Sequence, residues 1–205
     1  MLFLEQQNLP NQIIFIRHGE KNDKNDDGNL NKVGVIHADC WLDFFKDKNR
    51  PSNISVPNSF YAMKKADKKD SSNRPYQTIL PLANSYNLPI NNQYLRDDCN
   101  SVVTDILSKN AGKNVLVCWE HKVIVDLVNE IIKQVYNDKC EFKTHSWGDK
   151  IQSTKDNPDD YSTLWKITFE ENKMHLHIYK GCSVNSDKKA DFHTKENKNP
   201  QLYSF

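Results

Sequence analysis

Short apolar runs alternate with longer amphipathic segments over the first two-thirds of the chain. The runs "IIFI" (13–16), "NSFYAM" (58–63) and "NVLVCW" (114–119) are rich in aliphatic, β-branched and aromatic residues, which is typical of strands buried on both faces of a sheet. A segment with helical periodicity follows each of them. The pattern predicts an α/β fold, a three-layer sandwich in which helices cover both faces of a mostly parallel central sheet.

The helical segments carry their own signals. In the first, apolar residues recur at helical spacing from Val33 to Phe44, and in the third they recur from Ile124 to Val135. The second begins near Arg74, with Pro75 in a first turn where its missing N–H costs little. Residues 162–179 predict a hairpin with its turn near Glu171 and Asn172, completing the sheet at one side.

Domain organisation follows from what interrupts this pattern. Neither an internal repeat nor a linker divides the 205 residues, whereas the chain becomes polar and rich in lysine after residue 182. We therefore expect one domain over residues 1–182, followed by a polar C-terminal tail over residues 183–205 that lacks the apolar content of a core.

Charge and cysteine content narrow the class of protein. The net charge is +1, so no global field attracts nucleic acid or an anionic membrane, and no apolar run approaches the length of a membrane span. The cysteines are scattered without a CxxC pair, which indicates reduced, buried thiols and a cytoplasmic protein. They are Cys40, Cys99, Cys118, Cys140 and Cys182. The oligomeric state leaves no mark in the sequence.

Candidate chemistry lies where the predicted strands meet the helices. Arg17 and His18 follow the first strand, Arg74 opens the second helix, and His121 lies just after the third strand. The carboxyl ends of parallel strands share one edge of a sheet, where helix N-termini also present free N–H groups. Nothing nearby in sequence neutralises these side chains together. Two guanidinium groups, two imidazoles and helix dipoles therefore predict a bound phosphate.

Four segments resemble, in order, the motifs of the histidine phosphatase superfamily, which has the phosphoglycerate-mutase-like fold. They are "RHGEK" (17–21), "NLNKVGVIHADCW" (29–41), "SSNRPYQTILPLANSYNLPI" (71–90) and "VLVCWEHKVI" (115–124). Together they span about the first two-thirds of the chain. The pieces "RPYQTILPLA", "CWEH" and "PDDYSTLW" (158–165) are similar to a branch of small phosphatase-like proteins.

The resemblance implies a role for each of these residues. His18 would attack phosphorus and form a phosphohistidine, while Arg17, Arg74 and His121 would hold the phosphoryl oxygens. Arg17 and Arg74 would also bind the substrate, and Glu20 would contact it or orient the loop. Since side chains supply the positive charge, no metal or cofactor is expected. Chemically, these are the roles that arginine and neutral imidazole suit.

The general acid departs from the family pattern. Well-known members carry a glutamate after the second strand–helix unit, whereas "NNQYLRDDCNS" (91–101) offers only Asp97 and Asp98 there. Glu120, directly before His121, is within plausible reach of a leaving-group oxygen. We favour Glu120 as the acid, with Asp97 as the alternative.

The remaining histidines have simpler interpretations. His37 is expected to pack on its own helix, and His175 and His177 to share one face of an edge strand. The "HLH" sequence at 175–177 lacks a nearby third ligand, so a metal site is not predicted there.

The sequence is compatible with three functions. The first is a metal-independent phosphomonoester hydrolase acting on a phosphorylated small molecule or phosphoprotein, with no nucleic acid or membrane partner. The second is a phosphoglycerate-type mutase, for which the chain is short of an enclosing cap. The third is a catalytically weak module that binds phosphate ligands or phosphoproteins.

Overall fold

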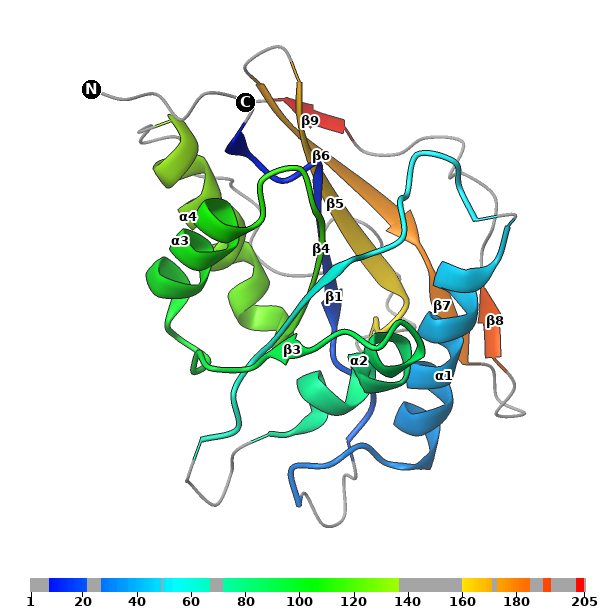
Figure 1. Ribbon diagram of the computed structural model, residues 1–205. Helices are drawn as coiled ribbons and strands as arrows, with labels where there is room; N and C mark the ends of the chain where they lie inside the picture. The colour runs from blue at the N-terminus through cyan, green and yellow to red at the C-terminus, as the bar shows by residue number, and fades with distance from the viewer. Residues whose placement is uncertain are drawn as a thin grey trace.

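The computed structural model describes residues 8–21, 27–48, 50–66, 72–136, 160–170, 173–184, 190–192 and 202–204. Its centre is a seven-stranded sheet with the strand order β3-β2-β4-β1-β5-β6-β9 (Figure 1). The parallel part contains β1 (Gln12–Arg17), β2 (Ser59–Ala62), β3 (Ile90–Asn91) and β4 (Asn114–Trp119). The antiparallel part contains β5 (Thr163–Glu170), β6 (Lys173–Lys180) and β9 (Leu202–Ser204). A separate two-stranded sheet pairs β7 (Cys182–Val184) with β8 (Ala190–Phe192).

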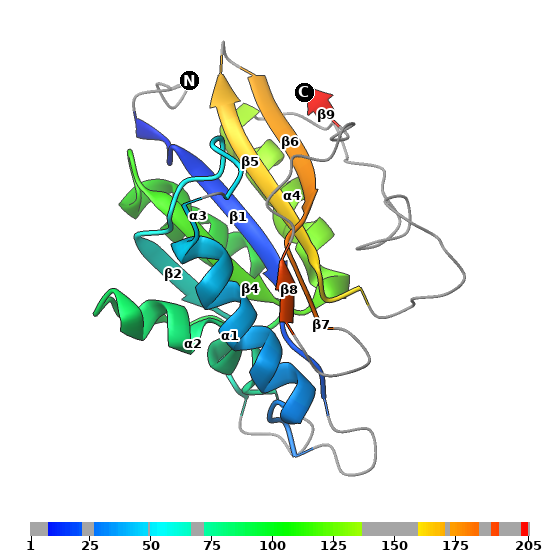
Figure 2. The ribbon, with the colours of Figure 1, turned by 90° about the vertical axis from the view of Figure 1, so that its right-hand side faces the viewer.

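Helices cover the two faces of the sheet. α1 (Lys32–Lys46) and α2 (Arg74–Ser85) pack on one face, and α3 (Cys99–Lys109) and α4 (His121–Tyr136) on the other (Figure 2). Side chains alternate along each strand, so Ile13 and Phe15 of β1 join the core under α3 and α4, while Ile14 and Ile16 join the core under α1 and α2. The predicted three-layer α/β fold is confirmed.

The C-terminal side of the sheet differs from the prediction. β9 pairs with β6 across His175 to His177, so β6 is an inner strand and the expected edge position of these histidines was wrong. The sequence gives no indication of this pairing, because the partner strand β9 lies near the end of the chain and is only three residues long. The boundary after residue 182 stays a prediction.

The cysteine prediction was also wrong in part. Cys40 of α1 and Cys182 of β7 form a disulfide, with their Cα atoms 5.8 Å apart. Their separation of 142 residues hides the pairing from any local spacing pattern. Cys118 is a buried free thiol as expected, Cys99 is a half-buried free thiol, and Cys140 lies outside the described residues.

Two further observations bear on the location of the protein. Disulfides are typical of oxidising compartments, so the cysteines no longer support a cytoplasmic protein. In the described part of the chain, no helix is both long and apolar enough to cross a bilayer.

Candidate active site

The carboxyl ends of β1 and β4 bring the first and the fourth motif together. These strands are parallel neighbours, with Arg17 aligned to Trp119, and the amide of His18 donates to the carbonyl oxygen of Trp119 at 3.3 Å. The chain continues from Trp119 into Glu120 and His121, where α4 begins. The sheet therefore places the histidine of one motif beside the acidic and imidazole groups of the other, as parallel topology requires.

Arg74 reaches this edge from the first turn of α2. The helix begins at Arg74 with Pro75 next to it, as the sequence predicted. The hydroxyl oxygen of Ser72 accepts a hydrogen bond from the Arg74 amide at 3.2 Å, which satisfies one of the free N–H groups at the helix start. Only 8% of Arg74 is exposed to solvent, so this cation is buried at the positive end of a helix. A cation at this end of a helix opposes the helix dipole, and an anion bound there would offset that effect.

Thr78 joins the loop after β1 to α2. Its hydroxyl oxygen accepts a hydrogen bond from the amide of Gly19 at 2.9 Å, and its hydroxyl donates to the carbonyl oxygen of Arg74 at 2.7 Å. The Thr78 side chain is fully buried. It therefore fixes the backbone beside His18 relative to the backbone of Arg74.

Two glycines let α1 approach the same loop at backbone contact. A Cβ atom at Gly34 would lie 2.7 Å from the carbonyl oxygen of Glu20, and one at Gly19 would lie 3.0 Å from the carbonyl oxygen of Gly34. The side chain of Asn31 caps α1 by accepting from the Gly34 amide at 2.8 Å. No other residue type fits at Gly34 without displacing the loop that carries His18.

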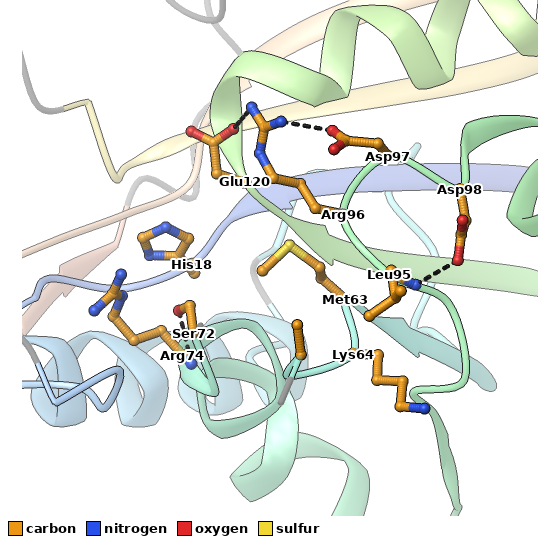
Figure 3. A pocket seen from close by; sticks show the side chains of 11 residues that line it. His18, Met63, Lys64, Ser72, Arg74, Leu95, Arg96, Asp97, Asp98 and Glu120 are labelled. Carbon is orange, nitrogen blue, oxygen red and sulfur yellow. Dashed lines mark hydrogen bonds and ion pairs between the residues drawn. The ribbon is translucent and has the colours of Figure 1, made fainter. Parts of the chain in front are cut away.

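A cavity of about 620 Å³ opens over these residues (Figure 3). His18, Ser72 and Arg74 lie at one end, and Figure 3 shows Glu120 and Arg96 along a second wall. The rest of the lining mixes apolar with charged side chains, including Met63, Lys64, Leu95, Asp97 and Asp98. The cavity is larger than a phosphate ion needs, so it has room for the remainder of a substrate.

The His18 imidazole is held neutral. Its Nδ1 lies 2.8 Å from the carbonyl oxygen of Gly19, which can only accept, so Nδ1 carries the hydrogen and Nε2 keeps its lone pair. Burial, opposed by this hydrogen bond and assisted by the charges of Arg17 and Arg74, lowers the pKa of His18 to about 4. At neutral pH the ring thus offers an unprotonated nitrogen, the form that a nucleophile requires.

Glu120 is held in the opposite state. Its Oε1 lies 2.9 Å from Nδ1 of His121, and its Oε2 accepts from Nη2 of Arg96 at 3.0 Å. Burial alone would raise the pKa of Glu120, but His121, the Lys122 amide and Arg96 outweigh it and lower the pKa to about 2. An ionised carboxylate cannot donate a proton, so this state does not suit the acid role expected of Glu120.

The other candidates occupy different positions. Asp97 lines the cavity, with a 77% exposed side chain whose Oδ1 lies 2.5 Å from Nη1 of Arg96. Oδ2 of Asp98 accepts from the Leu95 amide at 2.8 Å, in the turn before α3. His121, with a 26% exposed side chain, adjoins Glu120 but is not among the described residues that line the cavity.

Glu20 turns away from the cavity. Its Oε1 lies 3.2 Å from Nδ1 of His37, whose side chain is 2% exposed. Among the described residues, Glu20 does not line the cavity, so its position suits orientation of the loop better than contact with substrate. His37, expected only to pack on its helix, has this carboxylate as its partner.

Tyr161 joins the site without having been singled out in the sequence. The guanidinium carbon of Arg17 lies 4.0 Å from the centroid of the Tyr161 ring, and Nη2 of Arg17 donates to the Tyr161 hydroxyl at 3.4 Å. The residue falls within "PDDYSTLW", one of the pieces that carries the family resemblance. The two residues are 144 positions apart in the sequence, so no local pattern pairs them.

In the described part of the chain, no three His, Cys, Asp or Glu side chains lie close enough together to bind a metal ion. The cationic side chains that line the cavity in this part of the chain are Lys64, Arg74 and Arg96.

Comparisons with known proteins give distant structural matches. No family model and no curated protein sequence matches the chain. The structure is similar to that of SixA from Agrobacterium tumefaciens, a candidate phosphohistidine phosphatase, with 14% identity and a TM-score of 0.44 over 78% of this chain and 92% of that one. It is also similar to the product of open reading frame Rv3214 from Mycobacterium tuberculosis, with 11% identity and a TM-score of 0.44 over 80% and 94% of the two chains. Because the identities and TM-scores are low, any function proposed for this chain must be argued from the side chains of the site itself.

Proposed function

We propose that the protein is a phosphomonoester hydrolase that works through a phosphohistidine on His18. The observation that carries the proposal is the state of His18, a buried neutral imidazole with Nε2 unprotonated, at one end of a cavity beside Arg74. The charges of Arg17 and Arg74 both act on this ring. A nucleophile flanked by two guanidinium groups is suited to a phosphoryl group, whose oxygens accept bidentate hydrogen bonds.

The reaction would proceed in two displacements. In the first, Nε2 of His18 attacks phosphorus, the P–N bond forms, and the bond to the leaving-group oxygen breaks. Arg17 and Arg74 offset the charge on the phosphoryl oxygens, while the Gly19 carbonyl stabilises the Nδ1–H of the ring as it becomes cationic. In the second, water attacks the phosphohistidine and gives one proton to the carboxylate left by the acid, the P–N bond breaks, inorganic phosphate leaves, and the neutral imidazole is restored.

Glu120 would act as an ionised positioning group. Its two oxygens face His121 and Arg96, so it sets the orientation of both side chains at the rim of the cavity. Asp97 is the alternative proton donor, because it lines the cavity and its 77% exposed side chain, although in contact with Arg96, can take up a proton from solvent before donating it. Its proton would pass to the leaving-group oxygen as the P–O bond breaks.

The substrate would be a phosphorylated small molecule or a phosphoprotein side chain. Beyond the phosphoryl end, the cavity offers the apolar Met63 and Leu95 next to the charged Lys64 and Arg96. This mixture suits an organic leaving group with both apolar and polar atoms.

The decisive experiment combines turnover with trapping of the intermediate. Purified protein should hydrolyse an aryl phosphate in the presence of a chelator, and brief incubation with labelled substrate should yield acid-labile, base-stable phosphoprotein. His18→Ala should abolish both signals. Activity that disappears with chelator and returns with a divalent ion would contradict the proposal. Phosphate binding without turnover or phosphoprotein would instead indicate a binding module.

A further inference from the structure

The Arg17 guanidinium lies over the ring of Tyr161. The guanidinium carbon is 4.0 Å from the ring centroid, and Arg17 as a whole is only 6% exposed. We propose that Tyr161 is a positioning residue for phosphate binding, which fixes the orientation of the Arg17 guanidinium by packing against it. The inference rests on the proposed function, in which Arg17 binds the phosphoryl group, and it assigns a role to a residue outside the four motifs.

The geometry of guanidinium explains why an aromatic ring is useful here. All five N–H donors lie in the plane of the group, so an anion is bound along its edges and never through its faces. An aromatic ring packed against the guanidinium leaves most of these donors to phosphate, and its negative π surface attracts the cation. The hydroxyl of Tyr161 accepts from Nη2 at 3.4 Å, which uses one donor and restrains rotation of the guanidinium.

Tyr161 is itself held by a cluster of hydrogen bonds at Asp160. Oδ1 of Asp160 accepts from the amide and the hydroxyl of Ser162 at 2.9 and 2.8 Å, and from the Thr163 amide at 3.1 Å. Oδ2 accepts from the Thr163 hydroxyl and from Nζ of Lys180 at 2.9 Å. Burial would raise the pKa of Asp160, but these contacts outweigh it and lower the pKa, so the carboxylate stays ionised.

The position of this turn directs the ring to Arg17. β5 begins at Thr163 and pairs with β1, with Leu164 opposite Ile16. Tyr161, two residues before β5, thus lies beside the end of β1 that carries Arg17. The Tyr161 ring also meets the imidazole of His37 edge-on, with centroids 6.2 Å apart, and its centroid lies 6.5 Å from that of the His18 ring. These contacts help to hold the ring in place, as a positioning residue requires.

Loss of the ring should weaken phosphate binding and leave the charge of Arg17 in place. A cation–π contact at a largely buried site corresponds to about a tenfold change in affinity or somewhat more. Tyr161→Leu should accordingly raise the Kd of inorganic phosphate about tenfold, whereas Tyr161→Phe keeps the aromatic ring and should raise it about twofold.

A fluorination series separates this role from a purely structural one. Phenylalanine at position 161, replaced in turn by analogues with more ring fluorines, keeps the shape while the negative potential of the ring face falls. Calorimetric titration with inorganic phosphate should show affinity decreasing stepwise with fluorination. A structural role predicts a flat series. The same substitutions at Tyr86, the exposed residue that follows α2, serve as the matched control.

Each outcome distinguishes this inference from the proposed function. If the wild-type protein binds phosphate and the series at position 161 is flat, the positioning role is overturned while the phosphatase proposal stands. An equal decrease in the Tyr86 series also overturns it, because the effect would not pass through Arg17. If the wild-type protein binds no phosphate, the proposed function fails and this inference fails with it.

Discussion

The hydroxyl oxygen of Thr78 lies 2.9 Å from the amide nitrogen of Gly19 and 2.7 Å from the carbonyl oxygen of Arg74. One buried side chain thus connects the loop that carries the nucleophile to the helix turn that carries a phosphate-binding arginine. The distance between His18 and Arg74 is therefore set within the protein and does not depend on a ligand.

Thr78→Val should break this connection while nearly preserving volume. The buried Gly19 amide would lose its acceptor, at a cost of about 1–3 kcal/mol in the free energy of unfolding. We also expect weaker phosphate binding, because the two motifs would no longer be held in register. Urea denaturation and phosphate titration measure the two effects. Thr78→Ser keeps the hydroxyl and should restore most of the binding; failure to do so would contradict the assigned role.

Gly34→Ala should disturb the site through α1. The new Cβ would lie 2.7 Å from the backbone oxygen of Glu20, and neither backbone segment can yield as a flexible side chain would. We expect a loss of about 1–3 kcal/mol in unfolding free energy, as in overpacked cores, with a fall in kcat/KM. Val35→Ala, at a neighbouring exposed position of the same helix, is the control and should leave kcat/KM unchanged. Wild-type activity and stability in Gly34→Ala would show that α1 can move away without consequence.

His18 should titrate well below an ordinary histidine. NMR titration of its ring, identified by comparison with His18→Ala, should give a pKa near 4 in the phosphate-free protein. Because the unfolded chain binds this proton near pH 6.5, it holds more protons than the folded protein between pH 6.5 and 4. The contribution of His18 to stability is therefore fully present above pH 6.5 and is lost as the pH falls to 4. A midpoint near 6.5 would contradict the buried, neutral state.

The two carboxylates of the cavity should respond differently to the leaving group. Asp97→Asn should slow hydrolysis of an alkyl phosphate by about a hundredfold, because a poor leaving group needs a proton, and should affect an activated aryl phosphate far less. Glu120→Gln should slow both substrates to a similar degree, since it loosens His121 and Arg96.

Ratios of kcat/KM for the two substrates measure this difference. Asp98→Asn, which keeps an oxygen for the Leu95 amide, is the neighbouring control and should leave the ratio unchanged. A loss confined to alkyl substrates in Glu120→Gln would return the acid role to Glu120. If no substitution changes the ratio, the proton comes from water or from the substrate.

The sequence could predict the strands and the edge they share because each buried strand is one contiguous apolar run. Arg17, His18 and Arg74 follow from that topology, since each lies within one residue of a strand end or helix start. α3 was not predicted. Its buried residues Val102, Val103, Ile106 and Leu107 have helical spacing, but they form only two short apolar pairs among polar residues.

What the sequence could not predict depends on pairs far apart along the chain. The contact of Tyr161 with Arg17 and the disulfide between Cys40 and Cys182 join residues more than a hundred positions apart. The ionised state of Glu120 is favoured first by its neighbour His121 and in addition by Arg96, which reaches it from the loop before α3. Hydrophobic periodicity predicts helices and strands from neighbouring residues, whereas a contact between distant residues produces no periodic pattern in the sequence.

The disulfide closes a covalent ring of chain from residue 40 to residue 182, with Arg74, Glu120 and Tyr161 inside it and Arg17 and His18 outside it. A protease that cuts once within this ring does not release a fragment. The nicked molecule keeps its full mass on a non-reducing gel and separates into two pieces only after reduction. Both halves of the phosphate site thus stay on one molecule, so a single cut inside the ring need not end phosphate binding as long as that bond is oxidised.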